Sequence, residues 1–301
     1  MKKLFWIFIA SPVLFSARIW AQETVKDTVF LIPFADTVLL DEVVVKAHKT
    51  IPMNNRWSDL QPVDLVTVAG ANGNLYKALE TLPGTQIQGE SGRLLVRGGS
   101  SDETQTYIDG MHVLNPYTST AENIPARGRY SPFMFSGINL STGGHSQEYG
   151  EALSAVLPLE TKDNSRINKV GISPSTVGIG GGGNHAFRNA SLALNLDYQN
   201  LALYNKVYPG RIDFKKPYQM FSGATQFRYT PSGSSVFKIY VGYDRTDYSN
   251  YTDNNRYLFC LGENKVYLNS TFRTAISGGW EWFSGMAYSL FDRKVDGAVT
   301  E

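Results

Sequence analysis

Cysteine is nearly absent from this sequence: Cys260 is the only one among 301 residues. An internal disulfide is therefore excluded, and with it the class of small secreted domains that disulfides hold together. A surplus of one charge sign is also lacking, because 28 Lys and Arg stand against 27 Asp and Glu. Nucleic-acid binding usually needs a basic surplus, so we expect no nucleic-acid partner.

Motifs for metal binding and catalysis are missing as well. None of the four histidines is paired at metal-ligand spacing: His48, His112, His145 and His185. Ser141, His145 and Glu148 lie close in sequence, but no Gly-x-Ser-x-Gly elbow would expose the serine. The glycine run GIGGGGNH at 178–185 lacks the Gly-Lys-Ser/Thr of a phosphate-binding loop, and we predict a flexible turn between strands there. We expect neither an enzyme nor a cofactor nor a metal site.

The longest hydrophobic run lies at the N-terminus. Lys2 and Lys3 precede an apolar stretch at 4–15, and the small residues Ala17 and Ala21 follow it. This order is typical of a cleavable signal peptide, and the run is shorter than the ~20 apolar residues of a spanning helix. We therefore predict export, with residues 1–21 removed by cleavage after Ala21.

The second half of the chain alternates between apolar and polar residues. Aromatic residues make up 13% of the sequence and glycine is plentiful, which favours β structure. In SLALNLDYQ, Leu192, Leu194 and Leu196 face one way, and Trp280 and Trp282 lie on a similar apolar face. Runs of about nine to eleven residues match tilted strands that cross a bilayer. A membrane β-barrel is predicted over 166–301, and a soluble β-sandwich is the alternative.

Residues 71–165 have the pattern of a compact mixed α and β domain. A short helix is predicted in NGNLYKALETLPG, capped by Asn72 or Asn74 and stopped by Pro83 and Gly84. RLLVRGG is predicted to be a strand that two glycines end. TQTYIDGMHVL is predicted to be a hairpin, because Asp-Gly at 109–110 suits the positive φ angles of a type I′ turn.

Short acidic-and-valine units fill residues 22–47, and the longest of them is DEVVV at 41–45. Three consecutive valines prefer an extended strand, whose backbone groups need a partner. The polar stretch that follows, broken by Pro52 and Pro62, is a poor partner. The strand is therefore predicted to add to the exposed sheet edge of another protein. The alternative is that it forms the first strand of the domain that follows.

Four phrases of the mixed domain together resemble the plug domain of TonB-dependent receptors: ALETLPG, LLVRGG, YIDGMHVLNP and the long segment at 131–163. They occur in the family's order and spacing, and the last is most similar to receptors from the Bacteroidetes. The resemblance covers about 41–165 well and extends more loosely into the strands beyond. The matching plug positions are Leu82, Pro83, Gly84, Arg97, Gly98, Asp109, Gly110, Gly143, Gly144, Glu148, Tyr149 and Gly150.

The resemblance implies an active transporter of the Gram-negative cell outer membrane. In this family a 22-stranded barrel encloses the plug, the substrate binds from outside, and TonB with ExbB and ExbD pulls on a segment called the TonB box. Asp41, Glu42, Val43, Val44 and Val45 are the candidate TonB box. Other expected partners are outer-membrane lipid, a surface lipoprotein, and a small-molecule, glycan or peptide substrate. Tyr107 and His112 are candidate ligand contacts at the plug apex, although a hairpin alone explains them.

The predicted fold is thus an α+β plug domain followed by the antiparallel strands of an incomplete transmembrane β-barrel. The predicted segments are the signal peptide 1–21, an N-terminal extension 22–47, a linker 48–70, the plug 71–165 and a partial barrel 166–301. The last has room for about seven strands, and we expect a truncated receptor. Arg97 and Glu148 are expected to pair across the interface between plug and barrel. The alternative function is a secreted or surface β-rich adhesion module that transports nothing.

Overall fold

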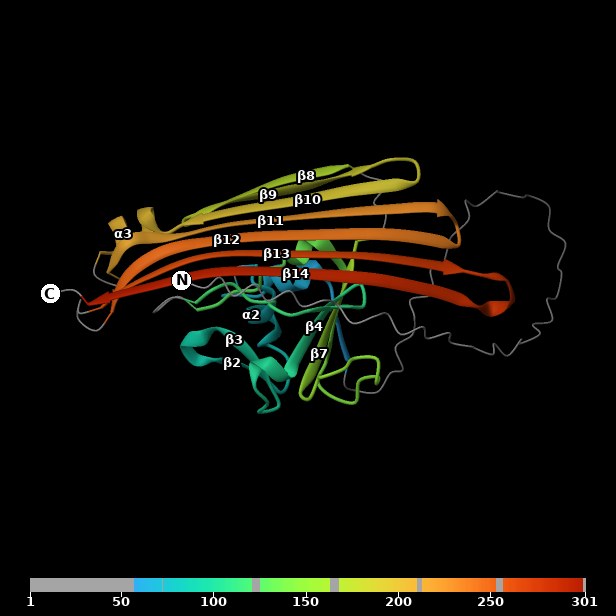
Figure 1. Ribbon diagram of the computed structural model, residues 1–301, viewed down its shortest axis with the longest axis horizontal. Helices are drawn as coiled ribbons and strands as arrows, with labels where there is room; N and C mark the ends of the chain where they lie inside the picture. The colour runs from blue at the N-terminus through green and yellow to red at the C-terminus, as the bar shows by residue number, and fades with distance from the viewer. Residues whose placement is uncertain are drawn as a thin grey trace, which may run out of the picture.

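The computed structural model describes residues 57–71, 73–120, 125–162, 168–209, 213–252 and 257–299. The predicted signal peptide and the candidate TonB box at 41–45 lie outside these residues. A long curved sheet lies over a smaller mixed domain (Figure 1). Within the described ranges, no helix combines the length and the hydropathy that a membrane crossing requires.

The mixed domain spans residues 57–162 and is built on a five-stranded sheet of order β1-β6-β7-β4-β5, with a separate β2-β3 hairpin. β4 and β7 run parallel, and the other paired strands of this domain run antiparallel. Its elements are β1 (Trp57–Leu60), α1 (Pro62–Thr67), α2 (Leu75–Leu79), β2 (Thr85–Gln88), β3 (Arg93–Val96), β4 (Thr104–Ile108), β5 (Met111–Val113), β6 (Phe135–Ser141) and β7 (Ala155–Thr161). Short 3-10 turns join some of them: η1 (Gly89–Ser91), η2 (Ser101–Glu103) and η3 (Pro132–Met134).

The mixed domain begins earlier than the sequence suggests. Strand β1 and helix α1 lie within the stretch 48–70 that was predicted to be a linker. β1 pairs antiparallel with β6, with Leu60 opposite Ile138, and Leu65 of α1 is almost fully buried. The boundary at residue 71 is therefore wrong. A four-residue strand of mixed polarity carries too little periodicity to be recognised before its partner is known.

Helix α2 confirms the predicted helix and its cap at Asn74. The Asn74 side chain accepts a hydrogen bond from the Tyr76 backbone N–H at 3.2 Å. The same oxygen accepts from the Gly128 N–H at 3.0 Å, so one side chain ties the helix to a distant loop. Leu75 and Leu79, four residues apart on one face of the helix, are buried in the core. The helix has five residues, which is shorter than the sequence indicates.

The β4–β5 hairpin forms the predicted turn. Asp109 has φ 49° and Gly110 has φ 83°, so both central residues have the left-handed conformation of a type I′ turn. Tyr107 lies opposite His112, and Ile108 lies opposite Met111. The turn geometry therefore follows from the hairpin's own sequence.

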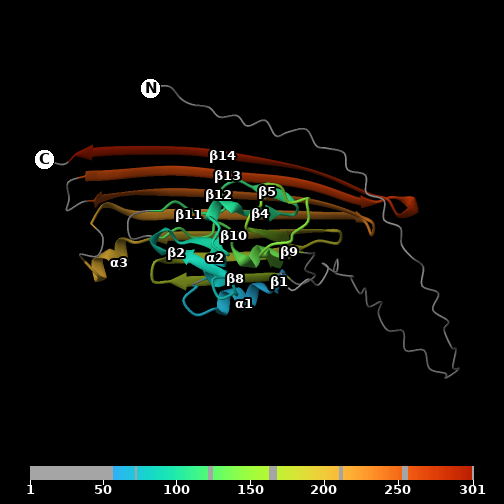
Figure 2. The same cartoon turned by 90° about the horizontal axis from the view of Figure 1, so that it is seen from below.

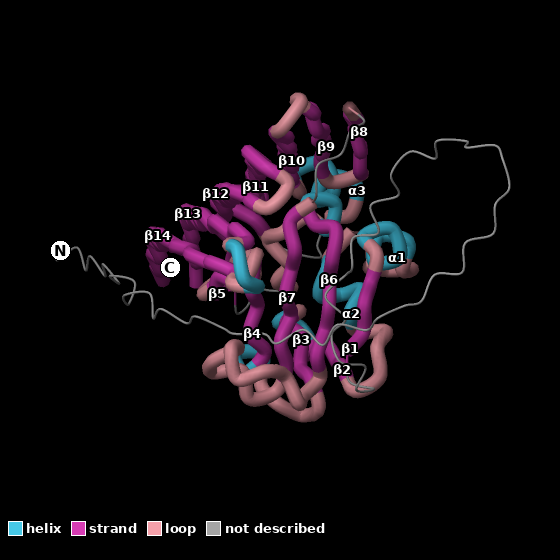
Figure 3. The backbone as a smooth tube through the Cα atoms, turned by 90° about the vertical axis from the view of Figure 1, so that its right-hand side faces the viewer, coloured by secondary structure: helices cyan, strands magenta, loops and turns pink. Residues whose placement is uncertain are grey.

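The long sheet is antiparallel and seven-stranded, in the order β14-β13-β12-β11-β10-β9-β8. Within the described residues it does not close on itself, and β8 and β14 form its two edges. Its elements are β8 (Lys169–Ser175), β9 (Gly178–Ala186), β10 (Ala190–Asn200), α3 (Ala202–Val207), β11 (Phe214–Ser232), β12 (Ser235–Thr252), β13 (Tyr257–Ala275), η4 (Ser277–Gly279) and β14 (Glu281–Val299). Seen along these strands, the sheet is an arc with the mixed domain on its concave side (Figure 3).

Two predictions about these strands are wrong. Strands β11 to β14 have 18 or 19 residues rather than nine to eleven, because ladder hydrogen bonds continue past the apolar part of each strand. The glycine run at 178–185 is not a turn but most of β9, which pairs with both β8 and β10. Two hydrogen-bonded neighbours outweigh the low strand propensity of glycine.

The two faces of the long sheet differ as the alternation predicts. Leu192, Leu194 and Leu196 are each about two-fifths exposed on the outer face. On the inner face, Tyr240 and Tyr267 are buried against the mixed domain. Viewed from below, the mixed domain lies across the middle of the long strands (Figure 2). The long sheet thus presents apolar side chains outward and meets the mixed domain inward.

Candidate functional site

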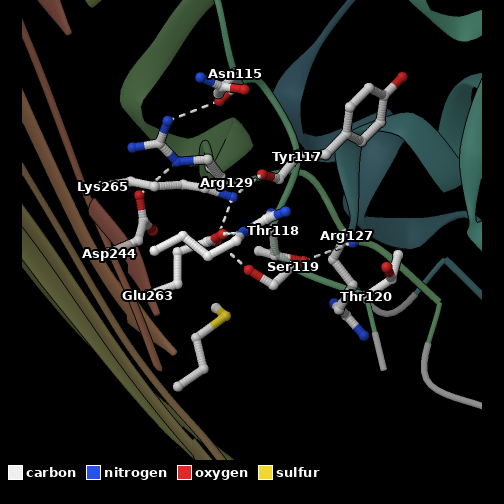
Figure 4. Close-up of polar contacts among 12 residues, drawn as sticks. Asn115, Tyr117, Thr118, Ser119, Thr120, Arg127, Arg129, Asp244, Glu263 and Lys265 are labelled. Carbon is white, nitrogen blue, oxygen red and sulfur yellow. Dashed lines mark hydrogen bonds and ion pairs between the residues drawn. The ribbon is translucent and has the colours of Figure 1, made fainter. Parts of the chain in front are cut away.

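The interface between the mixed domain and the long sheet holds the most concentrated set of buried charges in the described structure. From the mixed domain come the β4–β5 hairpin and a loop whose described parts are 115–120 and 125–130. The two arms of the loop are held together by a bridge between Tyr117 and Gly128. The Thr118 backbone N–H also donates to the Arg127 carbonyl at 2.8 Å. The two arms are therefore held at a fixed spacing, and the loop presents its polar groups to the sheet (Figure 4).

Arg129 connects this loop to strand β12. Its Nε donates to Oδ2 of Asp244 at 2.6 Å, and both side chains are more than nine-tenths buried. Its Nη1 donates to the Asn115 carbonyl at 2.7 Å, which fixes the guanidinium from the loop side. Asp244 also accepts from the Ser222 hydroxyl of β11 at 2.6 Å. Each charge therefore has its own support, which a buried ion pair needs to offset its desolvation.

Glu263 of strand β13 is the centre of a second group. The Ser119 hydroxyl of the loop forms a hydrogen bond with its Oε1. Lys265 lies 2.6 Å from the same oxygen, and Arg293 Nε of β14 donates to Oε2 at 2.6 Å. Lys265 also donates to the Tyr117 carbonyl at 3.0 Å. Loop and sheet thus share a network in which Glu263 is only 2% exposed.

A further polar contact lies beside this network. The Tyr248 hydroxyl of β12 donates to the Thr120 carbonyl at 2.5 Å. Like the contact from Lys265, it ends on a backbone carbonyl of the loop. The loop conformation, and not only its side chains, is therefore recognised by the sheet.

The β4–β5 hairpin makes a separate contact with the same strands. Lys238 of β12 donates to Oδ1 of Asp109 at 2.7 Å, and the Asp109 side chain is only 4% exposed. Thr161 of β7 binds the other oxygen of Asp109 through its hydroxyl at 2.6 Å. Asn269 of β13 donates to the Ile108 carbonyl at 3.0 Å. The turn residue that shapes the hairpin is therefore also the residue that attaches it to the sheet.

Packing completes this second contact. A Cβ atom placed on Gly285 of β14 would lie 2.7 Å from Cε and 2.8 Å from Sδ of Met111. The end of the Met111 side chain thus packs directly against the glycine and would have to shift to admit a Cβ. Gly110 lies next to the Phe283 ring, with 3.6 Å from its Cβ position to Cζ. The hairpin tip is held by shape as well as by charge.

Burial controls the ionisation of the groups on the mixed-domain side. Burial lowers the pKa of Arg129, but Tyr130 and Asp244 outweigh it and raise that pKa overall, so the guanidinium stays charged. Burial raises the pKa of the Tyr76, Tyr117 and Tyr130 phenols, so they stay neutral at physiological pH. The mixed-domain side of the interface therefore presents a charged guanidinium among neutral phenols.

Comparison with known proteins accounts for this arrangement. Residues 64–156 match the model of the family described as TonB-dependent Receptor Plug Domain. The chain carries a TonB-dependent receptor plug. The seven long strands are the barrel strands that adjoin it, so the predicted fold class is confirmed. None of the curated proteins is significantly similar in sequence.

Solved structures show the same fold at low sequence identity. The copper transporter OprC matches with TM-score 0.58 and 12% identity, over 80% of this chain and 37% of OprC. The siderophore receptor PirA from Pseudomonas aeruginosa matches with TM-score 0.54 and 14% identity, over 80% and 41%. The outer membrane transporter YddB from Escherichia coli matches with TM-score 0.58 and 13% identity, over 77% and 38%. The chain spans about two-fifths of the length of these proteins.

Most of the predicted plug positions lie away from the buried interface. Arg97, in the left-handed region at φ 50°, and Glu148 are exposed. Among the described residues, Arg129–Asp244 and Asp109–Lys238 are ion pairs between plug and barrel, and the pairing of Arg97 and Glu148 across the interface stays a prediction. Asp109 and Gly110 are the predicted positions that reach the barrel. Of the other plug positions, Leu82 packs against the domain core, and four glycines have positive φ angles: Gly84, Gly98, Gly143 and Gly144. The remaining positions are Pro83, Tyr149 and Gly150, and Pro83 and Gly150 are exposed.

Tyr107 and His112 lie side by side in the hairpin, with ring centroids 5.3 Å apart. Tyr107 donates to the Gly150 carbonyl at 3.0 Å, and the His112 ring bonds Gln105 at 2.6 Å. They lie on the hairpin and not on the loop at 115–130. Their contact with a ligand stays a prediction.

The sequence did not single out the residues that hold the plug: Ser119, Arg129, Lys238, Asp244, Glu263 and Lys265. One signal for some of them was present. Lys238 and Asp244 lie on the same face of strand β12, the face that carries its polar residues. In a barrel this face points inward, and a charge there needs a partner. Which loop of the plug supplies that partner depends on the tertiary structure.

Proposed function

We propose that this protein is an outer-membrane transporter that binds a substrate outside and releases it into the periplasm with energy delivered by TonB. The observation that carries the proposal is a plug domain held on the inner face of barrel strands through the ion pairs Arg129–Asp244 and Asp109–Lys238. Polar contacts of this kind are geometrically specific and can be exchanged for water when the plug moves. A plug held only by apolar packing would expose that surface to water on every opening.

TonB, with ExbB and ExbD, is the proposed source of the pull. Asp41–Val45 has the composition of a strand that adds to an exposed sheet edge, where backbone hydrogen bonds supply the affinity. These residues precede the first described plug strand, β1. A pull on them would therefore reach the plug through β1 and its partner β6.

The substrate is proposed only as a class. Among the similar structures are a copper transporter and siderophore receptors. Copper ions and ferric siderophores are therefore the first probes to try, before glycans, peptides or other small molecules. A surface lipoprotein stays an expected partner, and the outer membrane is the proposed location.

Deletion of residues 41–45 in the full-length protein tests the proposal. We expect accumulation of radiolabelled copper or ferric enterobactin to fall to the level of a tonB-deficient strain, while binding at the cell surface is unchanged. Deletion of the weaker unit Asp36–Val38 is the matched control and is expected to transport normally. A surface adhesin would be indifferent to both deletions.

A second test does not depend on the substrate. A cysteine at Val44 is expected to form a disulfide with a cysteine placed in the TonB strand-binding region, and a cysteine at Val29 is not. Equal crosslinking at both positions, or none at either, would contradict the assignment of the TonB box.

A further inference from the structure

A hollow of about 220 Å³ lies on the face of the long sheet that points away from the plug. Six of its lining residues have the outward parity of β12, β13 and β14: Arg245, Asp247, Gly262, Asn264, Asp292 and Lys294. A Cβ placed on Gly262 would meet nothing within 4 Å, so this glycine leaves the hollow open. Glu263 also borders it, but Lys265 and Arg293 hold that carboxylate.

The hollow lies directly beyond the apolar band of the outer face. Tyr243, Val266 and Leu290 form the last apolar row across the three strands. The next row is Arg245, Asn264 and Asp292, and the one after it is Asp247, Gly262 and Lys294. The Tyr243 hydroxyl donates to Oδ1 of Asn264 at 3.1 Å, so its ring lies in the apolar band and its hydroxyl in the polar row. An aromatic residue divided in this way is typical of the boundary between hydrocarbon and headgroups.

The two ends of the long sheet differ in their connections. At one end, residues 201–213 join β10 to β11 and include helix α3 (Figure 1). At the other end, 187–189 and 233–234 are short turns. Outer-membrane barrels have short turns on the periplasmic side and longer loops outside. Strand β12 runs from a short turn towards the α3 end, and Arg245 lies in its second half. In the proposed membrane the hollow is therefore level with the headgroups of the outer leaflet.

The charges around the hollow leave one positive charge in surplus. The charges that line it, or pair with a lining charge, are Lys216, Arg245, Lys294, Asp247 and Asp292. Lys216 of β11 binds Asp247, and no ion pair among the described residues uses Arg245, Asp292 or Lys294. Asp296 has the same outward parity but lies one row farther from the apolar band and does not line the hollow. Three cations thus stand against two carboxylates.

We propose that this hollow binds one phosphate group of an outer-leaflet lipid headgroup, an inference that rests on the outer-membrane location proposed above. Arg245 supplies a planar fork of donors for phosphate oxygens, and Lys294 supplies a point charge. The surplus of one positive charge suits one phosphate. The adjoining apolar row gives the acyl chains of the same lipid a surface to lie on, which a free phosphate ion could not use.

Binding of bis-phosphorylated lipid A to the purified full-length protein in detergent, followed by native mass spectrometry, tests this site. Arg245→Gln combined with Lys294→Gln is expected to weaken binding about thirtyfold, because each cation near an anionic lipid surface contributes about fivefold. The matched control is Lys169→Gln combined with Arg188→Gln, which removes two exposed cations at the opposite end of the sheet. The control should bind lipid A as the unchanged protein does. Equal weakening in both double variants would overturn the proposal, since general charge attraction would then explain the binding.

Gly262→Leu tests the shape of the site without changing its charge. The leucine fills the hollow without displacing a neighbour, so most of the lipid A binding should be lost while the thermal unfolding temperature is unchanged. Unchanged lipid binding in this variant would refute the hollow as the site.

Two further ligands identify what is recognised. Dephosphorylated lipid A should bind weakly, and equally to the unchanged protein and to the Arg245 and Lys294 double variant. If it binds as tightly as the phosphorylated lipid, or if inorganic phosphate alone binds as tightly, the proposal is wrong. These measurements need neither TonB nor a transported substrate. Normal uptake after deletion of 41–45 would therefore refute the transport proposal without affecting this one, and loss of lipid binding specificity would refute this one alone.

Discussion

Arg129 and Asp244 lie 115 residues apart in sequence and form a 2.6 Å ion pair in which both side chains are more than nine-tenths buried. One belongs to a plug loop and the other to the inner face of a barrel strand. A buried ion pair adds little net stability when it is intact, but loss of one partner leaves the other charge buried without a counter-ion. We therefore expect the pair to fix where the plug sits more than how stable the plug is.

Replacing Asp244 with Asn tests this role, because the shape is kept and the charge is lost. We expect seating of the plug against the barrel to weaken by about 3–5 kcal/mol, measured by hydrogen exchange across the loop at 125–130. The control is Glu281→Gln, which breaks the exposed pair with Arg273, whose side chains are 58% and 56% exposed. That change should cost no more than about 1 kcal/mol. Equal effects of the two variants would mean that the buried pair has no special role.

The hairpin contact predicts a non-additive pair of substitutions. Lys238→Met should loosen the hairpin by about 3 kcal/mol, because Asp109 keeps its charge and loses its counter-ion. Asp109→Asn still suits the positive φ of the turn, so it should cost less. The double variant is expected to be more stable than Lys238→Met alone, since neither charge is left buried. Strict additivity in exchange of the β4–β5 amides would argue against direct coupling.

The contact at Gly285 predicts a steric effect that can be rescued. Gly285→Leu should push Met111 out and detach the hairpin, because even a Cβ there comes within 2.8 Å of the methionine. Met111→Ala in the same chain should restore much of the docking, measured by disulfide crosslinking between hairpin and barrel. Gly262→Leu, on an open stretch of β13, is the control. Failure of the rescue would place the damage in strand β14 itself.

Buried phenols predict that the plug loosens in alkali. Burial raises the pKa of Tyr76 well above its ordinary value of 10.0 and raises the pKa of Tyr149 to about 12. Because the folded pKa values are higher, the stability from these groups is complete below pH 10 and is lost as pH rises beyond it. Tyrosinate absorbance and plug hydrogen exchange, followed together, should increase above pH 10.

Tyr76→Phe separates this effect from general alkaline unfolding. The variant loses the 2.8 Å hydrogen bond with Thr106 and should be about 1 kcal/mol less stable at neutral pH. It should also lose less stability between pH 10 and 12 than the unchanged protein. The same alkaline loss in both proteins would show that Tyr76 does not contribute.

Short-range features could be read directly from the sequence. The Asp109–Gly110 turn, the Asn74 cap and the outward Leu192, Leu194 and Leu196 each depend on a few neighbouring residues and on backbone rules. The turn predicted at 178–185 was wrong because that prediction also used only local preferences. Its local preference is a turn, and only two hydrogen-bonded neighbouring strands make it the strand β9.

The sequence by itself determined the parity of the barrel strands, the hairpin and the identity of the plug, because these are written in neighbouring residues. The alternation along β12 also gives Lys238 and Asp244 the same parity as each other. Only the tertiary structure decided which plug residues meet them, because Asp109 and Arg129 are more than a hundred residues away along the chain. A buried charge requires a partner of opposite charge. The local sequence does not specify which distant segment supplies that partner, because only folding brings the two segments together.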